Sequence, residues 1–249
     1  NVLPQLNAKP TLWMAGDSIM QSYAPGDKPV TGWGEMLHTL AHGDAVCQTA
    51  HRADCPFPQE MRYELPGLVI DNCAMAGRSS KTFREEGRLD DIAAHIRPGD
   101  LLVVSFGHND ANHSKAERYV PADAFGESLR PFWDAARSHG AVCIFASPVA
   151  MREFDEDGTC RPSFAAYREA MRAFAAEVGA PFIDLGAATA AANTAFGAER
   201  CKARYMWVDA KQDNAHQRNA GACRTAQAFV QQLLQDTTPA LDVLRANFK

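Results

Sequence analysis

Five short apolar runs, spaced evenly along the chain, constrain the fold more than any other feature of this sequence. They lie at residues 11–15, 68–72, 101–106, 141–146 and 181–185, and helical patterns separate them at residues 32–42, 88–96, 122–139, 163–178 and 221–234. Near-continuous apolar strands that alternate with helices are typical of a parallel sheet buried on both faces. Right-handed crossovers then predict an α/β fold of three layers, α/β/α, around a five-stranded parallel sheet.

One segment, residues 43–66, departs from this alternation. It carries Cys47, Cys55, Pro56 and Pro58 between a helical pattern and a strand pattern. We therefore expect a surface insertion there. The chain has no internal repeat and no long linker, so residues 1–249 are predicted to form a single domain.

Charge and hydropathy exclude several classes of partner. The 249 residues carry a net charge of −5, which argues against a general nucleic-acid binder, because such proteins need a basic face. No apolar run approaches the roughly 20 residues that span a bilayer, so no membrane partner is expected. The absence of a visible signal peptide and the odd number of cysteines, seven, favour a cytoplasmic location. A secreted protein with a trimmed leader stays open, as does the oligomeric state.

Polar residues follow the first three predicted strands, and a fourth polar group lies near the end of the chain. These groups occupy residues 16–18, 76–80, 107–110 and 213–216. In open parallel sheets, ligands bind beyond the carboxyl ends of the strands. We therefore expect the four groups to converge on one edge of the sheet.

These groups contain the parts of a serine hydrolase. The chain has no GxxxxGK[ST] or GxGxxG phosphate-binding motif and no GxSxG motif. A serine hydroxyl becomes a nucleophile when a base and an orienting acceptor stand beside it. Asp213 and His216, three positions apart, can lie side by side on one turn with the imidazole facing Ser18. The Ser18 amide, the Gly77 amide and the Asn109 side chain are candidate donors to an oxyanion.

The order and context of Ser18, Gly77, Asn109 and His216 resemble the four sequence blocks of the SGNH (GDSL-type) hydrolases. The likeness narrows further, because five segments between residues 11 and 234 look like rhamnogalacturonan acetylesterases, a carbohydrate-esterase family. These segments are WMAGDSIM, GWGEML, NCAMAGRSSKTFREEGRLDDI, GDLLVVSFGHND and DNAHQRNAGA. The family fold, a flavodoxin-like sheet of five parallel strands, agrees with the strand pattern.

The resemblance implies a role for each residue of these blocks. Ser18 would be the nucleophile, and His216 the general base and then the general acid. Asp213 would orient His216, while the Ser18 amide, Gly77 and Asn109 would form the oxyanion hole. The implied reaction removes O-acetyl groups from a plant cell-wall polysaccharide of the rhamnogalacturonan or pectin type, through an acetyl-enzyme, with no metal and no organic cofactor.

Three alternatives to this function remain open at this point. The same scaffold could serve other acetylated sugars, of the xylan or sialic acid type, or a short-chain lipid or thioester with an apolar acyl channel. The third is a carbohydrate-binding module without catalysis. The presence of Asp213 and His216 argues against it, because such a module would need neither residue. Residues 43–66 and the Lys-, Arg- and Glu-containing residues 112–119 depart from the family pattern. Both segments could border the site, so the substrate is less constrained than the reaction.

Several residues are candidates for substrate contacts. Trp33, Tyr205 and Trp207 could stack on sugar rings, although core packing is the commoner role of an aromatic side chain. His108 could line the cleft or pack under its loop. Arg78 begins a basic cluster that could attract uronate carboxylates or form an ordinary solvated helix face. This cluster consists of Arg78, Lys81, Arg84 and Arg88.

A second group of residues has the chemistry of a metal site. His38, His42, Cys47, His51 and Cys55 supply nitrogen and sulfur ligands over a short stretch. Their spacing matches no common zinc motif, and a Cys47–Cys55 disulfide is equally compatible. We therefore expect no metal, with structural zinc and the disulfide as alternatives for this segment.

Overall fold

The structure is a computed structural model that describes residues 9–43, 52–208 and 212–249. Six strands form its sheet in the order β2-β3-β1-β4-β5-β6. β3, β1, β4, β5 and β6 run parallel to one another. Without β2, their order is the 2-1-3-4-5 order of flavodoxin-like folds, so the predicted fold class is confirmed. The strands are β1 (Thr11–Gly16), β2 (Met61–Glu64), β3 (Val69–Asn72), β4 (Leu101–Ser105), β5 (Val142–Ala146) and β6 (Phe182–Ile183).

The predicted number of five strands is wrong, because β2 adds a sixth. This strand lies in the segment that was expected to be a surface insertion, and it pairs with β3 in the antiparallel direction. Tyr63 is buried while its neighbours on the strand are half-buried. Arg62 donates two hydrogen bonds to Asp71, of 2.8 and 2.6 Å. Backbone pairing and this ion pair therefore hold a short strand whose sequence carries little apolar signal.

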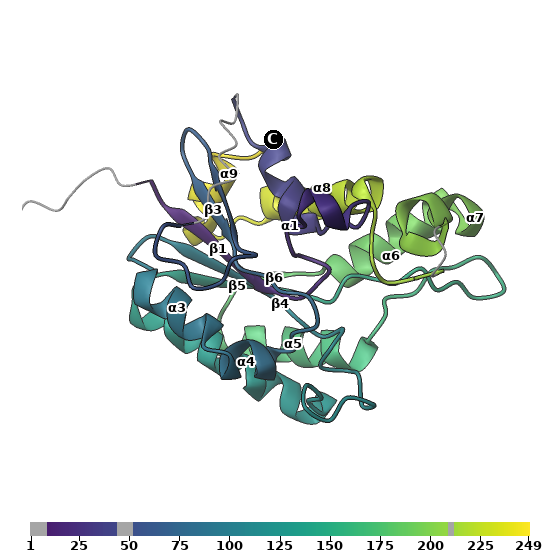
Figure 1. The fold of residues 1–249 in the computed structure, drawn as a ribbon, viewed down its shortest axis with the longest axis horizontal. Helices are drawn as coiled ribbons and strands as arrows, with labels where there is room; N and C mark the ends of the chain where they lie inside the picture. Colours follow the sequence, from purple (N-terminus) through teal and green to yellow (C-terminus); the bar gives the residue numbers. More distant parts are fainter. Residues whose placement is uncertain (1–8, 44–51, 209–211) are drawn as a thin grey trace, which may run out of the picture.

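Helices cover both faces of the sheet (Figure 1). α2 to α5 lie on one face, and α1, α6, α8 and α9 lie on the other. None of the helices in the described ranges is long and apolar enough to cross a membrane. The α-helices are α1 (Trp33–Met36), α2 (Ser80–Glu85), α3 (Arg88–His95), α4 (Ala122–Ser138), α5 (Ala165–Val178), α6 (Leu185–Phe196), α7 (Ala198–Cys201), α8 (Asn219–Gln235) and α9 (Asp242–Arg245). Short 3-10 helices lie at Pro25–Asp27, Leu37–Leu40, Lys202–Arg204, Met206–Val208 and Pro239–Leu241.

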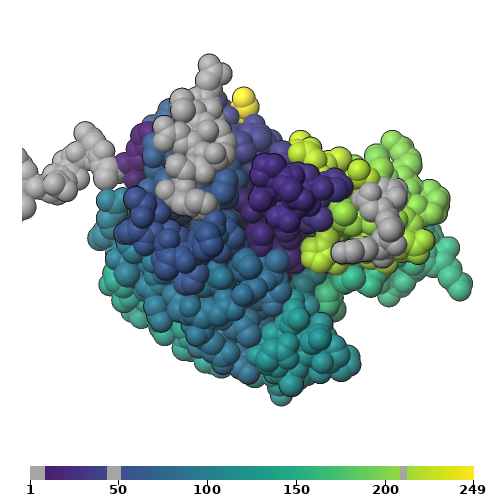
Figure 2. Space-filling view, in the orientation of Figure 1, coloured from purple at the N-terminus to yellow at the C-terminus, as the bar shows by residue number. Residues whose placement is uncertain are grey.

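The core has two halves, one on each side of the sheet. Side chains alternate along a strand, so Leu12 and Met14 of β1 point to one half and Trp13 and Ala15 to the other. In the first half, the ring of Trp33 in α1 packs 5.1 Å from that of Phe229 in α8. The space-filling view shows the purple early segment against the yellow-green C-terminal segment (Figure 2). Packing of the core thus brings α1, early in the sequence, against α8, which lies late in it.

Candidate active site

The four predicted polar groups converge at the carboxyl ends of the central strands. Ser18 follows β1, Gly77 follows β3 and Asn109 follows β4. β1 lies between β3 and β4 in the sheet, so the chain leaves β1 at the point where the strand order reverses direction. Such a point is where open α/β sheets leave a crevice for ligands.

Ser18, His216 and Asp213 form a continuous hydrogen-bonded chain. His216 Nε2 lies 2.9 Å from Ser18 Oγ, and His216 Nδ1 lies 2.6 Å from Asp213 Oδ2. An ionised carboxylate only accepts hydrogen bonds, so Nδ1 carries the imidazole proton and Nε2 accepts from the serine hydroxyl. Ser18 is only 8% exposed, so little water competes for its hydroxyl.

The turn that carries Asp213 fixes the carboxylate before it meets the imidazole. Asp213 Oδ1 accepts hydrogen bonds from the amides of Ala215 (2.7 Å) and His216 (3.0 Å). Partial burial raises the pKa of Asp213, but these amides and the imidazole lower it more, so the net pKa lies below the ordinary value. The carboxylate is therefore ionised and held in place. The turn is tied to the rest of the fold by backbone hydrogen bonds from Met206 to His216 (3.0 Å) and from Arg152 to Asn214 (2.7 Å).

The three candidate oxyanion donors, the Ser18 amide, the Gly77 amide and the Asn109 side chain, follow adjacent strands at this edge of the sheet. Gly77 has a φ of +78°, a backbone angle that residues other than glycine rarely adopt. Among the described residues, neither the Ser18 amide nor the Gly77 amide has an acceptor. The Asn109 side chain is held from both ends: its Nδ2 donates to the Arg78 carbonyl (3.0 Å), and its Oδ1 accepts from Arg118 Nη1 (2.8 Å). One Nδ2 proton of Asn109 is thereby left for a ligand.

Two buried carboxyl groups lie beneath the site. Asp17 Oδ1 accepts from the Ile19 amide (2.9 Å), while its Oδ2 has no partner among the described residues. Burial, with a contribution from Asp110, raises the pKa of Asp17 to about 7. Asp110 accepts from the Ser80 amide, the Ser80 hydroxyl and the Gly107 amide, and burial raises its pKa to about 6. Both groups brace the loops that carry Ser18 and Asn109, in positions where ionisation is disfavoured.

A cavity of about 340 Å³ opens beside Ser18 and His216. His108 Nε2 donates to the Val149 carbonyl (3.0 Å), which leaves Nδ1 as an acceptor. Burial lowers the pKa of His108 to about 4, so the ring is neutral near pH 7. Phe164 adopts a left-handed φ of 55°, and its ring meets that of His108 edge-on at 4.7 Å. The lining residues are Ser18, Ile19, His108, Asn109, Ala111, Asn112, His113, Met151, Phe164, Ala215 and His216.

Sequence patterns did not single out Phe164, Met151 or Ala111 as part of this site. A left-handed backbone at a non-glycine residue is uncommon, and nothing in the local sequence of Phe164 signals it. Met151 and Ala111 are apolar residues in loops. The one usable signal was the departure of residues 112–119 from the family pattern, since Asn112 and His113 do line the cavity.

Two expected sugar-stacking residues are corrected. Trp33 is 0% exposed and packs within the core against Phe229. Tyr205 is 1% exposed; its hydroxyl accepts from Asn193 (2.9 Å) and donates to the Ala150 carbonyl (2.9 Å). Neither ring presents a face to a ligand, because burial of a large aromatic ring outweighs any surface role.

Two of the four cations in the basic cluster at residues 78–88 are paired. Arg78 and Arg88 both pair with Glu86, and Arg88 is buried with its guanidinium over the Phe57 ring. Arg84 donates to the Ser80 carbonyl. Attraction of uronates by the other two cations, Lys81 and Arg84, stays a prediction.

Trp207 is half-buried and lies beside the turn that carries Asp213 and His216. The guanidinium of Arg152 lies over its ring, 4.6 Å from the centroid, and the Arg152 backbone bonds to Asn214. A contact between Trp207 and substrate thus stays a prediction, with one face of the ring already used.

The proposed zinc ligands do not gather in the part of the chain that is described. His38 bonds the Glu35 carbonyl through Nδ1 and stacks on Tyr63 at 4.5 Å. Cys55 carries a free thiol that donates to Glu60 Oε2 (3.0 Å). Cys47 and His51 lie outside the described residues. Within those residues, the one cluster of possible metal ligands is Cys55, Glu60 and Asp91, and Arg52 already donates to Asp91 (2.6 Å).

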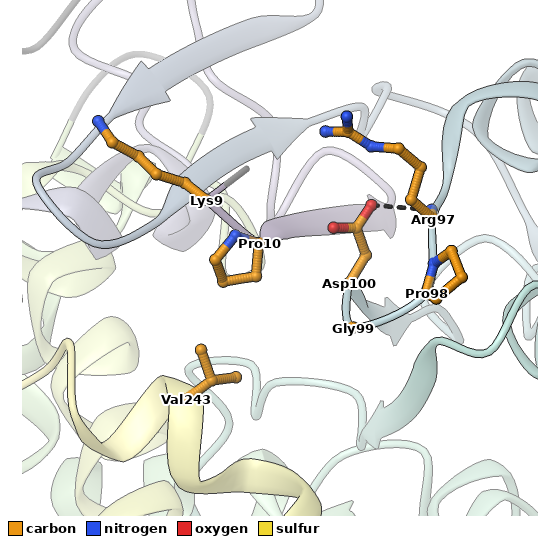
Figure 3. Close-up of a pocket in the computed structure, with 7 residues that line it drawn as sticks. All are labelled: Lys9, Pro10, Arg97, Pro98, Gly99, Asp100 and Val243. Carbon is orange, nitrogen blue, oxygen red and sulfur yellow. Dashed lines mark hydrogen bonds between the residues drawn. The ribbon is translucent and has the colours of Figure 1, made fainter. Parts of the chain in front are cut away.

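A second cavity, of about 440 Å³, lies at the opposite, amino ends of β1 and β4 (Figure 3). Its one carboxylate, Asp100, accepts from the amides of Thr11 (2.8 Å) and Arg97 (3.0 Å) and from Trp13 Nε1 (3.1 Å). Asp100 therefore fastens the start of β1 to β4. Both of its oxygens already accept hydrogen bonds from the fold, so Asp100 has a structural role in this cavity.

Comparison with known proteins identifies the family of this chain. Residues 14–221 match the model of the GDSL-like Lipase/Acylhydrolase family. The chain is 32% identical over 242 residues to the rhamnogalacturonan acetylesterase RhgT of Bacillus subtilis, covering 94% of this chain and 93% of RhgT.

Two solved structures resemble the fold. The crystal structure of protein YxiM of Bacillus subtilis superposes with a TM-score of 0.77 and 26% identity, over 94% of this chain and 58% of that chain. The acetylxylan esterase Axe2 of Geobacillus stearothermophilus has a TM-score of 0.58 and 20% identity, over 90% and 93%, and at that identity the likeness shows the fold alone. From its family match and its close relative, this chain belongs to the GDSL-like lipase and acylhydrolase family and is a carboxylic ester hydrolase.

Proposed function

We propose that this protein is a serine carbohydrate O-acetylesterase that acts on a rhamnogalacturonan- or pectin-like polysaccharide. The observation that carries the reaction type is the chain from Asp213 through His216 to Ser18, with distances of 2.6 and 2.9 Å. The substrate class rests on similarity to a rhamnogalacturonan acetylesterase at 32% identity over nearly the whole of both chains. The cavity of about 340 Å³ beside Ser18 gives room for an acetyl group and part of a sugar ring.

In the first half-reaction, Ser18 Oγ forms a bond to the acetyl carbonyl carbon while its proton passes to His216 Nε2. Asp213 stabilises the imidazolium that results. The negative oxygen accepts hydrogen bonds from the Ser18 and Gly77 amides and from Asn109 Nδ2. The carbon–oxygen bond to the sugar then breaks, and His216 returns the proton to the sugar oxygen.

In the second half-reaction, water replaces the sugar. His216 removes a proton from the water, whose oxygen attacks the acetyl group on Ser18. The same donors stabilise the second oxyanion, and the bond to Ser18 Oγ breaks as His216 returns the proton. Acetic acid and the free serine result, and the acid then loses its remaining proton to the solvent as acetate.

The cavity also offers contacts for the sugar. His108 Nδ1 can accept a hydrogen bond from a sugar hydroxyl, since Nε2 is committed to the Val149 carbonyl. The rings of Phe164 and His108 form one wall. Trp207 is a candidate for a more distant sugar contact, while Arg78 is tied to Glu86.

Acetate release from acetylated rhamnogalacturonan, acetylated xylan and an aryl acetate tests the proposal, with Ser18→Ala as the control. Release from the pectic substrate that Ser18→Ala abolishes is the expected result. Turnover of xylan or the aryl acetate alone would keep the serine esterase and reject the pectic substrate. Rates that rise with acyl chain length would instead favour a lipid or thioester hydrolase, and binding without turnover would favour a carbohydrate-binding module.

A further inference from the structure

Arg118 joins two of the loops that carry the proposed oxyanion hole. Its Nη1 donates to Asn109 Oδ1 (2.8 Å) and to the Gly77 carbonyl (3.2 Å). Asn109 follows β4, whereas Gly77 follows β3. A single guanidinium nitrogen therefore contacts two donor-bearing residues that come from different strands.

The segment around Arg118 is anchored rather than loose. The Val120 amide donates to the Asp110 carbonyl (3.0 Å), and the Tyr167 hydroxyl donates to the Val120 carbonyl (2.8 Å). The Arg118 amide donates to the Lys115 carbonyl (3.0 Å). The Arg118 side chain is 24% exposed, so the contact with Asn109 is shielded from most of the solvent. These backbone contacts thus fix the position of the Arg118 main chain, and Asn109 and Gly77 fix the position of its guanidinium group.

The contact decides which atom of the Asn109 amide faces the ligand. Oδ1 accepts from a cation, and one Nδ2 proton goes to the Arg78 carbonyl (3.0 Å). The second Nδ2 proton is left on the side of the cavity that Asn109 lines. A charged donor on Oδ1 also draws electron density from the amide, which makes its N–H groups stronger donors.

We propose that Arg118 is a positioning residue for the oxyanion hole: it orients and polarises the Asn109 amide and ties it to the Gly77 turn. The inference rests on the proposed function, in which Asn109 and Gly77 bind the oxyanion. Arg118 does not touch the reacting atoms, so its effect passes through Asn109. Its substitution should therefore lower kcat more than it raises KM, because the oxyanion forms only in the transition state.

Steady-state kinetics on a soluble aryl acetate test this role. Arg118→Met keeps an unbranched apolar stem and removes every donor; we expect kcat to fall about 10- to 100-fold, with KM changed by no more than about twofold. Arg118→Lys should recover part of the loss, since an ammonium can donate to Asn109 Oδ1. The matched control is Arg130→Met on α4, which loses ion pairs with Glu127 and Glu177 but no contact with the site, and it should keep wild-type kcat.

A double-substitution cycle separates positioning from general damage to the fold. In an Asn109→Ala background, Arg118→Met should cost much less activity than it does in the wild type, because only its contact with the Gly77 carbonyl remains to be lost. A full second loss there, or an unchanged kcat in Arg118→Met alone, overturns the inference while Ser18-dependent activity of the wild type stands. Wild-type protein that shows no Ser18-dependent turnover overturns the proposed function and this inference with it. Thermal unfolding of each variant confirms that the compared proteins are folded.

Discussion

Ser18 Oγ and His216 Nε2 lie 2.9 Å apart although 198 positions separate the two residues in the sequence. The distance is set by two loops, one after β1 and one before α8, that meet because α1 and α8 pack on the same face of the sheet. Each loop has its own backbone hydrogen bonds: Met20 donates to Asp17, and Met206 donates to His216. The contact is therefore held in place by the backbone of both loops.

Asp213→Asn should lower kcat by about 10³- to 10⁴-fold. The amide can no longer accept from Nδ1 of His216 as a carboxylate does, so the imidazole loses the tautomer that accepts from Ser18. Ester hydrolysis at saturating aryl acetate measures the effect. The matched control is Asp242→Asn on α9, whose exposed side chain bonds only Arg245. Retention of more than about a tenth of wild-type kcat in Asp213→Asn would contradict the assigned role.

His108→Phe should weaken binding of the polysaccharide and spare small esters. The substitution keeps a ring against Phe164 and removes both the Nδ1 acceptor and the Nε2 donor to the Val149 carbonyl. Loss of the acceptor should raise KM for the acetylated polysaccharide about tenfold, as expected for one lost hydrogen bond. KM for an aryl acetate should stay unchanged, because that substrate offers no sugar hydroxyl. His139→Phe at the exposed end of α4 is the control. An equal rise for both substrates would mean that His108 shapes the cavity rather than binding sugar.

Phe164→Ala should widen the range of acyl groups that the enzyme accepts. Phe164 forms a wall of the cavity beside Ser18, and its removal opens space for added methylenes. The ratio of kcat/KM for aryl butyrate to that for aryl acetate should rise about tenfold, within the range that one or two methylenes command in an apolar pocket. Phe154→Ala, a half-buried aromatic outside the cavity lining, should leave the ratio unchanged. The idea fails if both variants shift the ratio alike.

Asp17 should make stability fall as pH rises. Burial raises its pKa in the folded state to about 7 from the ordinary 3.8. Between about pH 4 and pH 7, the unfolded chain has therefore lost this proton while the folded protein retains it, and the free energy of unfolding decreases with pH. The full effect is up to about 4 kcal/mol. Asp110, whose pKa is raised to about 6, adds a smaller change in the free energy of unfolding, with the same sign.

Urea unfolding of Asp17→Asn at pH 4.5 and 7.5, about the limits of this window, measures the contribution. An asparagine can still accept from the Ile19 amide but does not titrate, so the variant should gain stability relative to wild type as pH rises. Asp242→Asn, which is exposed, should follow the wild-type slope. Identical slopes in wild type and Asp17→Asn would show that Asp17 ionises normally in the folded protein.

Tyr205→Phe separates a core role from a binding role. The substitution removes the hydroxyl that bonds Asn193 and Ala150, and it should lower the free energy of unfolding by about 1–3 kcal/mol. KM for the polysaccharide should not change, because the ring is buried. A raised KM with unchanged stability would show instead that the hydroxyl contacts the substrate.

The fold was predictable because its signals are local and repeated. Each parallel strand of the sheet is an apolar run next to a helical pattern, and the polar residues after β1, β3 and β4 fall together once the strands are parallel. β2 was missed because MRYE has no apolar run; its pairing with β3 and the Arg62–Asp71 ion pair supply what the sequence pattern lacks. Single-domain organisation of residues 1–249 stays a prediction.

The site was predictable at the residues with distinctive chemistry and not at those that act by placement. Ser18, Asp213 and His216 lie together where spacing and order suggested. Trp33 and Tyr205 were misassigned because the residue type alone does not show whether an aromatic side chain is buried in the core or exposed at a binding surface. Arg118 and Phe164 were missed for the opposite reason: their importance comes from the loop path that brings one to Asn109 and holds the other in a left-handed backbone.

The outermost strands of the sheet bear on how the protein behaves at high concentration. β6 is only two residues long, and β2, at the other border, is four residues long and carries Arg62 and Glu64. An edge strand has unpaired backbone groups to which a strand of another chain can add. Short edge strands with charged side chains resist such addition. We therefore expect β2, the antiparallel strand that the apolar pattern failed to predict, to hinder aggregation at this edge of the sheet. It covers β3, the strand that Gly77 follows.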